Sequence, residues 1–571
     1  MRIRTVLAAL LALFALLTIF DRFALAERLI LRTALPLLMA TGVALACVGL
    51  GALARRSDEA DAPLDLLLGY PLFGTICFVV GTLEIAAWLM ITITAIAAAV
   101  GVLLLLAGWK SQSRAAAAAP SGGWAALAVV AVMLCAFVPA QAPPSAPDEL
   151  AYHLAVPQTW VNDGRATELP LLSQSYFPLG IESADLPALS LLGPAAGGVA
   201  SHFLHLFAAI ATAMVILRRT GSWLLTAALV TTPALAVTAG WSLVDWPLAG
   251  LFVVLFVALE NDDRRLASVA TAAGLLVQYT FLPFALVAWA LRRRWPQWIV
   301  LIGLVFFVRN LILTGNPLAP FFSADAPVIF GFRTLALADY VFEDSFLHEA
   351  LGAAIVALPA FAVGALPIAS ALMALGLFFL APSSRILVPY LLVPSLTAAG
   401  ATGKRWFAGL LAISVVVQTL LVIAFTAQGG AFSLLAGGVS ETAYLRGKRP
   451  AYAAIKAIDQ MLPRDSRTLV VGIGESYWFT RPVRGGGMLD GARVSRYLDL
   501  PTPEAVRARL REDGITHVAL IDAPVPTNVA GEVEERQPAL SASAQRMLAI
   551  TLNRYAVGVT SREHATLFTL R

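Results

Sequence analysis

The stretch that decides the fold is "WAALAVVAVMLCAFVPAQAPPSAPDELAYHLAVPQTWVNDGR", residues 124–165. Its first half is an apolar run about as long as the roughly 20 residues that a helix needs to cross a bilayer. Its second half turns polar at a pair of prolines and carries two adjacent acids, Asp148 and Glu149. The stretch therefore predicts a membrane-spanning helix followed by a loop that emerges at one membrane surface.

Apolar runs of this kind recur from Leu7 to about Ala427 and then stop. Of the 571 residues 59% are hydrophobic and 13% are charged, whereas a soluble protein carries about twice that charged fraction. The composition predicts a polytopic α-helical membrane protein with about 13–15 transmembrane helices. The predicted crossings are 5–20, 29–52, 65–84, 86–108, 122–140, 197–217, 222–240, 246–260, 266–277, 280–291, 297–313, 350–363, 366–381, 386–400 and 406–426.

The basic residues set the expected orientation. With the N-terminus in the cytoplasm and the first helix uncleaved, every predicted cytoplasmic loop carries Lys or Arg, as the positive-inside bias requires. The net charge of +4 is explained by these loops, so no nucleic-acid partner is predicted. The loops 141–196 and 314–349 and the whole C-terminal tail are then expected on the outer side. The three cysteines all lie in apolar runs and are expected to be buried thiols.

From 441 onward the composition changes from apolar runs to alternating strand and helix patterns. "RTLVVGIG", "ITHVALID" and "ATLFTL" are short β-branched runs, separated by polar helical segments such as "PTPEAVRARLREDG". This alternation predicts a small α/β domain. The expected organisation is a transmembrane domain over 1–440 and an extracytoplasmic α/β domain over 441–571.

The acids after the first quoted helix have two interpretations. Pro147 suits a helix start and acids are favoured in a first turn, so Asp148 and Glu149 could cap a helix, or one of them could be a catalytic base. Helical spacing pairs Asp148 with Tyr152 and Glu149 with His153. At most one of the two acids is therefore expected to face a site directly.

Other candidate residues lie on predicted outer elements. Asp245, in "GWSLVDWPLAG", stands between two apolar crossings, where an ionisable group is costly and a functional role is the default hypothesis. Glu182 follows a proline turn in the large outer loop. Arg309 and Asn310 lie at an outer helix end, and Arg385 begins another crossing, where an arginine either snorkels or binds a phosphate.

Acids and arginines together at an outer membrane surface favour one chemistry. A carboxylate can take the proton of a hydroxyl nucleophile, and a guanidinium can stabilise a departing phosphate. This combination suits transfer from a lipid phosphate to a hydroxyl. Ion conduction requires polar groups along a path through the whole bilayer, and no run of charges follows the inner halves of the helices.

The motifs "APDELAYH", "LVDWPLA", "RNLILTGNPLAPF" and "RILVPYLLVP", followed by an outer α/β tail, resemble the C-fold superfamily of integral-membrane glycosyltransferases. The group with protein O-mannosyltransferases and the lipid A aminoarabinose transferase is most similar. The resemblance covers most of residues 120–571, while 1–110 has no match in the family core. It implies an inverting enzyme of the bacterial-type inner membrane with a polyprenyl-phosphate-linked sugar donor.

The resemblance also implies roles for particular residues. Asp148 falls on the family's proposed base, and Asp245 is the match for a second outer acid. Where the family often has a lysine that meets the donor phosphate, this chain has Gln278, so Arg385 or Arg309 is expected to take that role. Asp148 and Asp245 are also the candidate ligands for a divalent metal ion, although two carboxylates are too few to predict a full ligand shell.

Two other functions share part of this pattern. A transporter or flippase of a lipid-linked saccharide would need internal repeats or broken helices at the membrane midplane. The sequence has no repeat, but "QYTFLP" interrupts the crossings between 266 and 291. A polysaccharide polymerase or ligase would share the chemistry and differ in its acceptor. The sequence names neither the sugar nor the acceptor, which is a hydroxyl of a glycan, a lipid or a protein.

Overall fold

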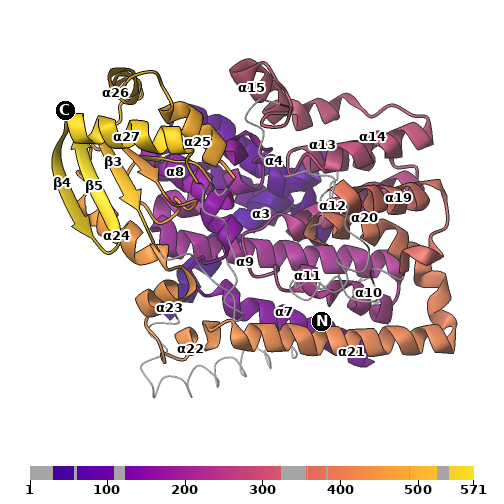
Figure 1. Cartoon of the computed structure of the whole chain (residues 1–571). Helices are drawn as coiled ribbons and strands as arrows, with labels where there is room; N and C mark the ends of the chain where they lie inside the picture. Colours follow the sequence, from indigo (N-terminus) through magenta and orange to yellow (C-terminus); the bar gives the residue numbers. More distant parts are fainter. Residues whose placement is uncertain are drawn as a thin grey trace.

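The computed structural model of the chain describes residues 30–56, 61–108, 123–322, 355, 358–380, 384–487, 489–523 and 539–570. These residues form a large body of helices and, at one end, a sheet with its own helices (Figure 1). Among the described residues, seven helices are long and apolar enough to cross a membrane, by length and composition. They are α3 (Leu35–Arg55), α4 (Ala62–Leu83), α5 (Ala87–Ala107), α7 (Gly123–Ala140), α9 (Leu186–Thr220), α20 (Ser384–Leu396) with the turn after it, and α21 (Arg405–Gln428).

The predicted class, a polytopic helical membrane protein, is confirmed by these helices. Shorter apolar helices lie between and beside them: α10 (Trp223–Val230), α11 (Pro233–Ala236), α12 (Asp245–Glu260), α13 (Arg264–Leu275), α14 (Phe281–Arg292), α15 (Val305–Thr314) and α19 (Ala365–Leu380). The predicted crossing at 5–20 lies outside the described residues, as does half of the one at 350–363. The count of 13–15 crossings therefore stays a prediction.

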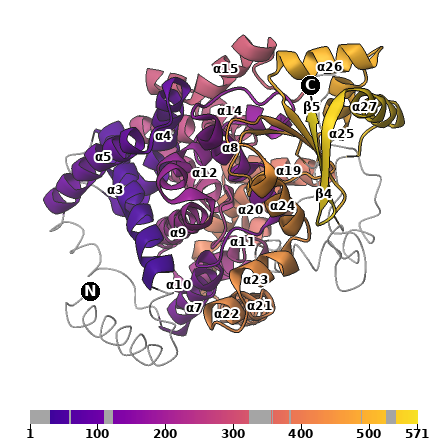
Figure 2. The same ribbon diagram turned by 90° about the vertical axis from the view of Figure 1, so that its left-hand side faces the viewer.

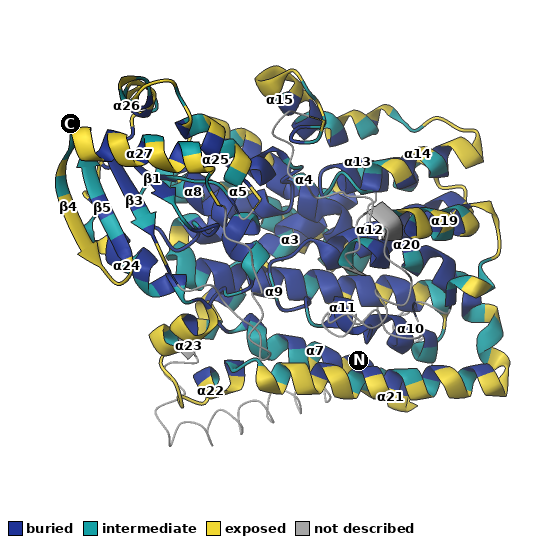
Figure 3. Ribbon diagram, viewed as in Figure 1, coloured by how far each residue is buried: buried dark blue, intermediate teal, exposed yellow. Residues whose placement is uncertain are grey.

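Small residues let the central helices approach closely. A Cβ atom added at Gly51 of α3 would overlap the backbone of Asp65 in α4, and one added at Gly69 of α4 would overlap the backbone of Cys47 in α3. Close approach at glycine is typical of helix packing in membranes, where van der Waals contact replaces the hydrophobic effect. Large apolar side chains of α5 and α21 are instead exposed, among them Ile96 and Leu103 of α5 and Ile413 and Leu420 of α21, as lipid-facing helices require. Figure 3 shows many exposed positions along α21.

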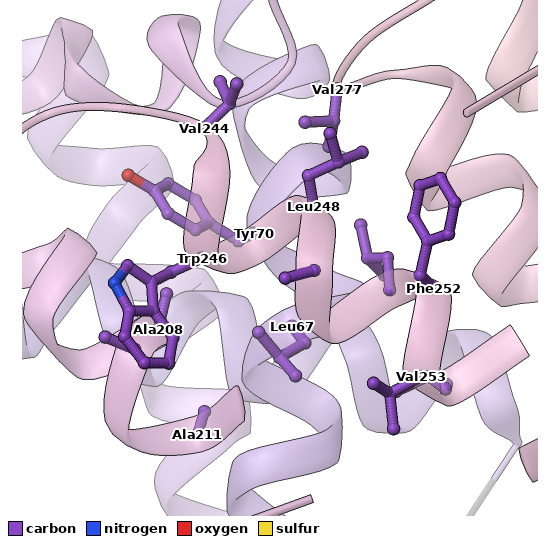
Figure 4. Close-up of a cluster of buried hydrophobic side chains, with 14 of the residues drawn as sticks. Leu67, Tyr70, Ala208, Ala211, Val244, Trp246, Leu248, Phe252, Val253 and Val277 are labelled. Carbon is purple, nitrogen blue, oxygen red and sulfur yellow. The ribbon is translucent and has the colours of Figure 1, made fainter. Parts of the chain in front are cut away.

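The start of α12 is fixed in the core. Val244, Trp246 and Leu248 are buried in an apolar cluster with Leu67 and Tyr70 of α4 (Figure 4). The indole N–H of Trp246 also donates a hydrogen bond of 2.7 Å to the carbonyl oxygen of Leu235. Because the residues on both sides of position 245 are anchored in this way, the side chain between them is held in a defined place.

The loop between α7 and α9, called the outer loop because the sequence predicts it on the outer side, contains four short helical elements. They are a π-helix, η2 (Glu149–His153), an α-helix, α8 (Ala155–Asp163), and two 3₁₀-helices, η3 (Ser173–Tyr176) and η4 (Glu182–Asp185). The α8 helix ends at Gly164, whose φ of 72° is a left-handed conformation that glycine adopts without strain. The loop is thus an ordered layer on one end of the helical body.

The C-terminal part contains a five-stranded sheet in the order β2-β1-β3-β5-β4. β1 (Thr468–Val471) pairs in parallel with β2 (Val483–Arg484) and β3 (His517–Ile521), while β5 (Ala565–Leu570) pairs antiparallel with β3 and β4 (Ala556–Arg562). Its helices are α23 (Glu441–Lys448), α24 (Ala451–Met461), α25 (Gly491–Leu498), α26 (Pro503–Glu512) and α27 (Ala542–Tyr555). The three predicted strands and the α/β character are confirmed; β2, β4 and α25 were not predicted.

The sheet-containing part packs on the outer loop (Figures 1 and 2). Asp163 at the end of α8 forms an ion pair with Arg484 of β2, with distances of 2.8 and 3.2 Å. The Asn162 amide donates 2.9 and 3.3 Å hydrogen bonds to the carbonyl oxygens of Phe479 and Arg481. The predicted boundary at 440–441 falls just before α23, after α22 (Ala431–Leu435).

Candidate functional site

Three charged side chains from three separate elements meet at the start of the outer loop. The guanidinium Nη1 of Arg385 lies 2.9 Å from Oδ2 of Asp148, and its Nε lies 3.2 Å from Oδ1 of Asp245. Arg385 is in the first turn of α20, Asp148 immediately precedes η2, and Asp245 is the first residue of α12. The sequence predicted each of these residues, and the structure places them together.

The contacts of Asp148 decide between the two interpretations of this acid. Its backbone is in the N-cap position of η2, but its carboxylate makes no capping hydrogen bond. Instead it binds Arg385, and about a third of its side chain is exposed, at 32%. A carboxylate that does not cap its helix, and that solvent and a ligand can reach, is available for chemistry.

The local electrostatics keep Asp148 ionised. Burial disfavours the charged form, but the charges of Arg385 and His153, together with the Arg385 hydrogen bond, outweigh burial and hold the pKa of Asp148 below its usual value. Asp245 is more buried, and its second oxygen, Oδ2, has no hydrogen-bond partner among the described residues. The site therefore combines two carboxylates with one guanidinium.

Glu149, the neighbouring acid, has a different environment. It is fully buried, and Oε1 accepts hydrogen bonds from the Ser242 backbone N–H at 2.6 Å and from Nε2 of His202 at 2.8 Å. Oε2 accepts from the backbone N–H groups of Ala146 at 3.0 Å and Ser145 at 3.3 Å. Although burial opposes ionisation, these partners hold the pKa of Glu149 below its usual value. Glu149 thus joins the loop, α9 and the turn before α12, which favours a structural role.

The helical spacing predicted for this segment is wrong in detail. The expectation paired Asp148 with Tyr152 and Glu149 with His153, as in an α-helix. The segment is instead a π-helix, in which the Leu154 N–H donates to the Glu149 carbonyl oxygen at 2.9 Å. A π-turn is closed by residues five apart. The four-residue spacing expected of an α-helix therefore does not apply within this turn.

His153 and Glu182 form a buried pair next to this turn. Nδ1 of His153 lies 2.7 Å from Oε1 of Glu182, and both side chains are at most 4% exposed. The ring of Tyr152 lies against that of His153, with 3.8 Å between ring centroids, and Tyr152 also contacts Phe177 edge-on. Although Glu182 follows a proline turn in the loop, it is not solvated, because η4 turns this residue inward.

Arg309, Asn310 and Gln278 lie apart from the three-residue cluster. Nη1 of Arg309 donates to the Ser175 carbonyl oxygen at 2.8 Å, and the Asn310 amide donates to the Tyr176 carbonyl oxygen at 2.5 Å. Both residues therefore hold the η3 turn onto α15. Gln278 is half-buried in the turn between α13 and α14, where its backbone N–H donates to Gly274 at 3.3 Å. Phosphate binding by these three side chains stays a prediction.

The residues present do not fit the metal site considered from the sequence. In the part of the chain that the structure describes, no group of three or more His, Cys, Asp and Glu side chains is placed to hold a metal ion. Moreover, the position between Asp148 and Asp245 is taken by the guanidinium of Arg385. A cation of the protein itself, the Arg385 guanidinium, already contacts both carboxylates.

Several polar residues beneath the cluster were not predicted. His202 and His205 lie on the buried face of α9, and Tyr70 contacts His205, with Oη 3.2 Å from Nδ1. Asp185 is also buried, and its Oδ1 has no hydrogen-bond partner among the described residues. The signal was present, since "ASHFLH" places two histidines in an apolar run, where ionisable residues are costly.

Comparison with known proteins finds similarity in structure. No family model and no curated protein matches the sequence. Solved structures that match include ArnT from Cupriavidus metallidurans in the apo state, at 14% identity over 78% of this chain and 97% of ArnT, with a TM-score of 0.49. ArnT bound to undecaprenyl phosphate matches at 14% identity over 79% and 98% of the two chains, with a TM-score of 0.47.

Arabinofuranosyltransferase AftD from Mycobacteria matches at 15% identity over 79% of this chain, with a TM-score of 0.43. The chain spans 40% of the length of AftD. AftD is an arabinofuranosyltransferase, and one of the two ArnT structures contains bound undecaprenyl phosphate. The similarity to these structures is in the backbone fold, and the sequence identity is low. Evidence for a function must therefore come from the side chains of the site.

Proposed function

We propose that the chain is an inverting C-fold glycosyltransferase. It moves a hexosyl or pentosyl group from a polyprenyl-phosphate-linked donor to a hydroxyl acceptor of a glycan, lipid or protein. The reaction takes place on the extracytoplasmic face of a bacterial-type inner membrane. The observation that carries the proposal is the single guanidinium of Arg385 between the carboxylates of Asp148 and Asp245 at the base of the outer loop.

Asp148 is the proposed general base. It is ionised, partly exposed and not used as a helix cap. As the acceptor hydroxyl attacks the anomeric carbon from the side opposite the phosphate, its O–H bond breaks and the proton passes to Asp148. The new bond joins the acceptor oxygen to the anomeric carbon, and the bond from that carbon to the phosphate oxygen breaks. The lipid leaves as polyprenyl phosphate.

Arg385 is the proposed binding group for that phosphate. A guanidinium recognises phosphate and carboxylate oxygens with the same planar arrangement of donors, so the contacts that now bind two carboxylates can be exchanged for contacts to the donor. The side chain is 28% exposed, which leaves part of it open to a ligand. Asp245, which is more buried, orients Arg385 and limits how far it can move.

The proposed orientation rests on charge. Arg55 pairs with Asp65 at 2.5 Å and Arg218 pairs with Asp61 at 2.6 Å, so basic residues gather at the ends of α3 and α9 away from the outer loop. Cytoplasmic loops are enriched in Lys and Arg. These pairs support a cytoplasmic N-terminus and an extracytoplasmic C-terminal α/β domain, an orientation that an exported reporter fused after position 571 tests.

The direct test is bond cleavage by purified protein. The probes are undecaprenyl-phosphate-linked hexoses and pentoses, given with glycolipids extracted from bacterial membranes as acceptors. Mass spectrometry should detect free undecaprenyl phosphate and a glycosylated acceptor. Donor that is recovered intact, or carried across a vesicle membrane unchanged, would contradict the proposal and favour the transporter interpretation.

A further inference from the structure

We infer that Asp148 is positioned for the reaction by a joint between three parts of the chain, in which Gly198 of α9 and Tyr477 of the C-terminal α/β part are positioning residues. This inference rests on the proposed function and gives the C-terminal part a role in it. Both residues act through the base-bearing segment, residues 143–150, which leads from α7 into the turn that contains Asp148.

The first observation is the close packing at Gly198. A Cβ atom added there would lie 2.2 Å from Cγ of Pro144 and 2.6 Å from Oη of Tyr477. Pro144 is four residues before Asp148, and Tyr477 follows β1 in the C-terminal part. Helix α9, the base-bearing segment and the C-terminal part therefore meet at this position, and the absence of a side chain on Gly198 leaves room for all three.

The second observation is that the C-terminal part binds the base-bearing segment directly. The backbone N–H of Ser476 donates a hydrogen bond of 3.2 Å to the carbonyl oxygen of Leu150. The Leu150 side chain is fully buried in one apolar cluster with Tyr477. Tyr444 of α23 adds a further contact, because its Oη lies 3.4 Å from Oγ of Ser145. The C-terminal part thus contacts this segment both before and after the proposed base in the sequence.

Both sides of this contact are themselves held in place. The fully buried Tyr477 hydroxyl donates to the carbonyl oxygen of Pro194 in α9, and Glu475 pairs with Arg449, where both side chains are at most 8% exposed. The carboxylate of Glu149 holds the base-bearing segment from within through its four hydrogen bonds. Because proline fixes φ, a shift at the joint is passed along this proline-rich segment to the proposed base.

The position of the base matters for the rate. A general base must lie within hydrogen-bond distance of the proton that it takes, and a misplacement of about 1 Å can cost on the order of 100-fold in rate. Ordinary van der Waals contact begins at 3.4 Å, so a methyl group at position 198 would require Pro144, Tyr477 or α9 to move by about 1 Å. The packing at Gly198 therefore sets where Asp148 lies.

The test is Gly198→Ala in the undecaprenyl-phosphate release assay, with rates expressed per amount of folded protein. We expect kcat to fall by about 100-fold. The donor KM should stay that of wild type, because the phosphate-binding Arg385 lies on α20 and is oriented by Asp245. Gly409→Ala is the matched control: Gly409 is a helical glycine of α21 with no atom within 4 Å of an added Cβ, so this variant should keep wild-type kcat and KM.

A second substitution distinguishes displacement of the base from a general loss of folding. Pro144→Ala removes the two ring atoms that a Cβ at position 198 would overlap, so the double variant with Gly198→Ala should recover part of the lost kcat. Tyr477→Phe removes the hydrogen bond to Pro194 and should lower kcat by a smaller factor, again with an unchanged donor KM. If Gly198→Ala does not fold, Tyr477→Phe decides by the same criterion.

Three results would overturn the positioning role while leaving the glycosyltransferase function intact. They are wild-type kcat in the folded variant that decides, a loss that appears in the donor KM instead of kcat, and a double variant that is no more active than Gly198→Ala alone. A wild-type protein that releases no undecaprenyl phosphate would overturn both the positioning role and the proposed function.

Discussion

Glu149→Gln separates the roles of the two adjacent acids most sharply. Glutamine keeps the size of the side chain but replaces one carboxylate oxygen by an NH₂ group. The buried carboxylate accepts four hydrogen bonds, at 2.6, 2.8, 3.0 and 3.3 Å. The one remaining oxygen can serve only one pair of these donors, and the NH₂ group then faces the other pair.

The expected loss of stability follows from that count. Each buried donor left unpaired costs about 1–3 kcal/mol, and breaking a buried ion pair costs about 3–5 kcal/mol. We therefore expect Glu149→Gln to lower the free energy of unfolding by about 3–5 kcal/mol. Asp148→Asn removes one partly exposed ion pair, which contributes about 1 kcal/mol or less.

The assay is unfolding of purified protein in detergent, followed by tryptophan fluorescence and by loss of the monodisperse peak in size exclusion. Glu149→Gln should unfold at a clearly lower temperature than wild type, and the protein that remains folded should retain much of its turnover. Asp148→Asn is the matched control and should unfold close to wild type. A Glu149→Gln variant that is as stable as wild type but inactive would refute the structural role of Glu149.

Three further changes test other parts of the site. Arg385→Lys keeps the charge but loses the planar pair of donors, so we expect a donor KM about tenfold or more higher with normal folding; an unchanged KM and kcat would mean that Arg385 only snorkels. Arg385→Gln removes the charge that lowers the pKa of Asp148. Activity needs the ionised carboxylate and is lost as pH falls through this pKa, so the acid limb of kcat/KM should move to higher pH, and an unmoved limb would show that another group titrates. Asp163→Asn breaks the ion pair with Arg484, in which the Asp163 side chain is 2% exposed and the Arg484 side chain 13% exposed. Proteases should then cut the C-terminal part faster; unchanged proteolysis would show that this ion pair does not hold the C-terminal part on the loop.

The fold class could be predicted because a membrane-spanning helix is encoded by a long continuous run of apolar residues, which is visible in the sequence. The apolar runs that form α3, α5 and α21 are continuous, and the strands after Arg467 stand out against polar helices. The edge strands β2 and β4 could not be predicted in the same way. β2 has only two residues, and β4 exposes most of its side chains, so neither carries the alternation of a half-buried strand.

Site residues could be predicted where a charged residue stands beside an apolar run, because burying a charge in such a place is energetically costly. Asp245 and Arg385 stand beside apolar runs, and Asp148 follows one, so each was identified from its neighbours. The bonds of Glu149 were not predictable, because its donors come from the Ser242 turn and from His202, which are distant in sequence. The π-turn escaped prediction as well, since no residue pattern distinguishes it from an α-helical turn.

The most direct test of the account is turnover by Asp148→Asn. Asparagine keeps the shape and caps helices about as well as aspartate, but it cannot accept the proton of the acceptor hydroxyl. General base catalysis contributes about 10²–10⁴-fold, so we expect the variant to fold normally and to release undecaprenyl phosphate at least about 100-fold more slowly than wild type. Near-normal release by a folded Asp148→Asn variant would contradict the assignment of Asp148 as the base, and with it the proposed mechanism.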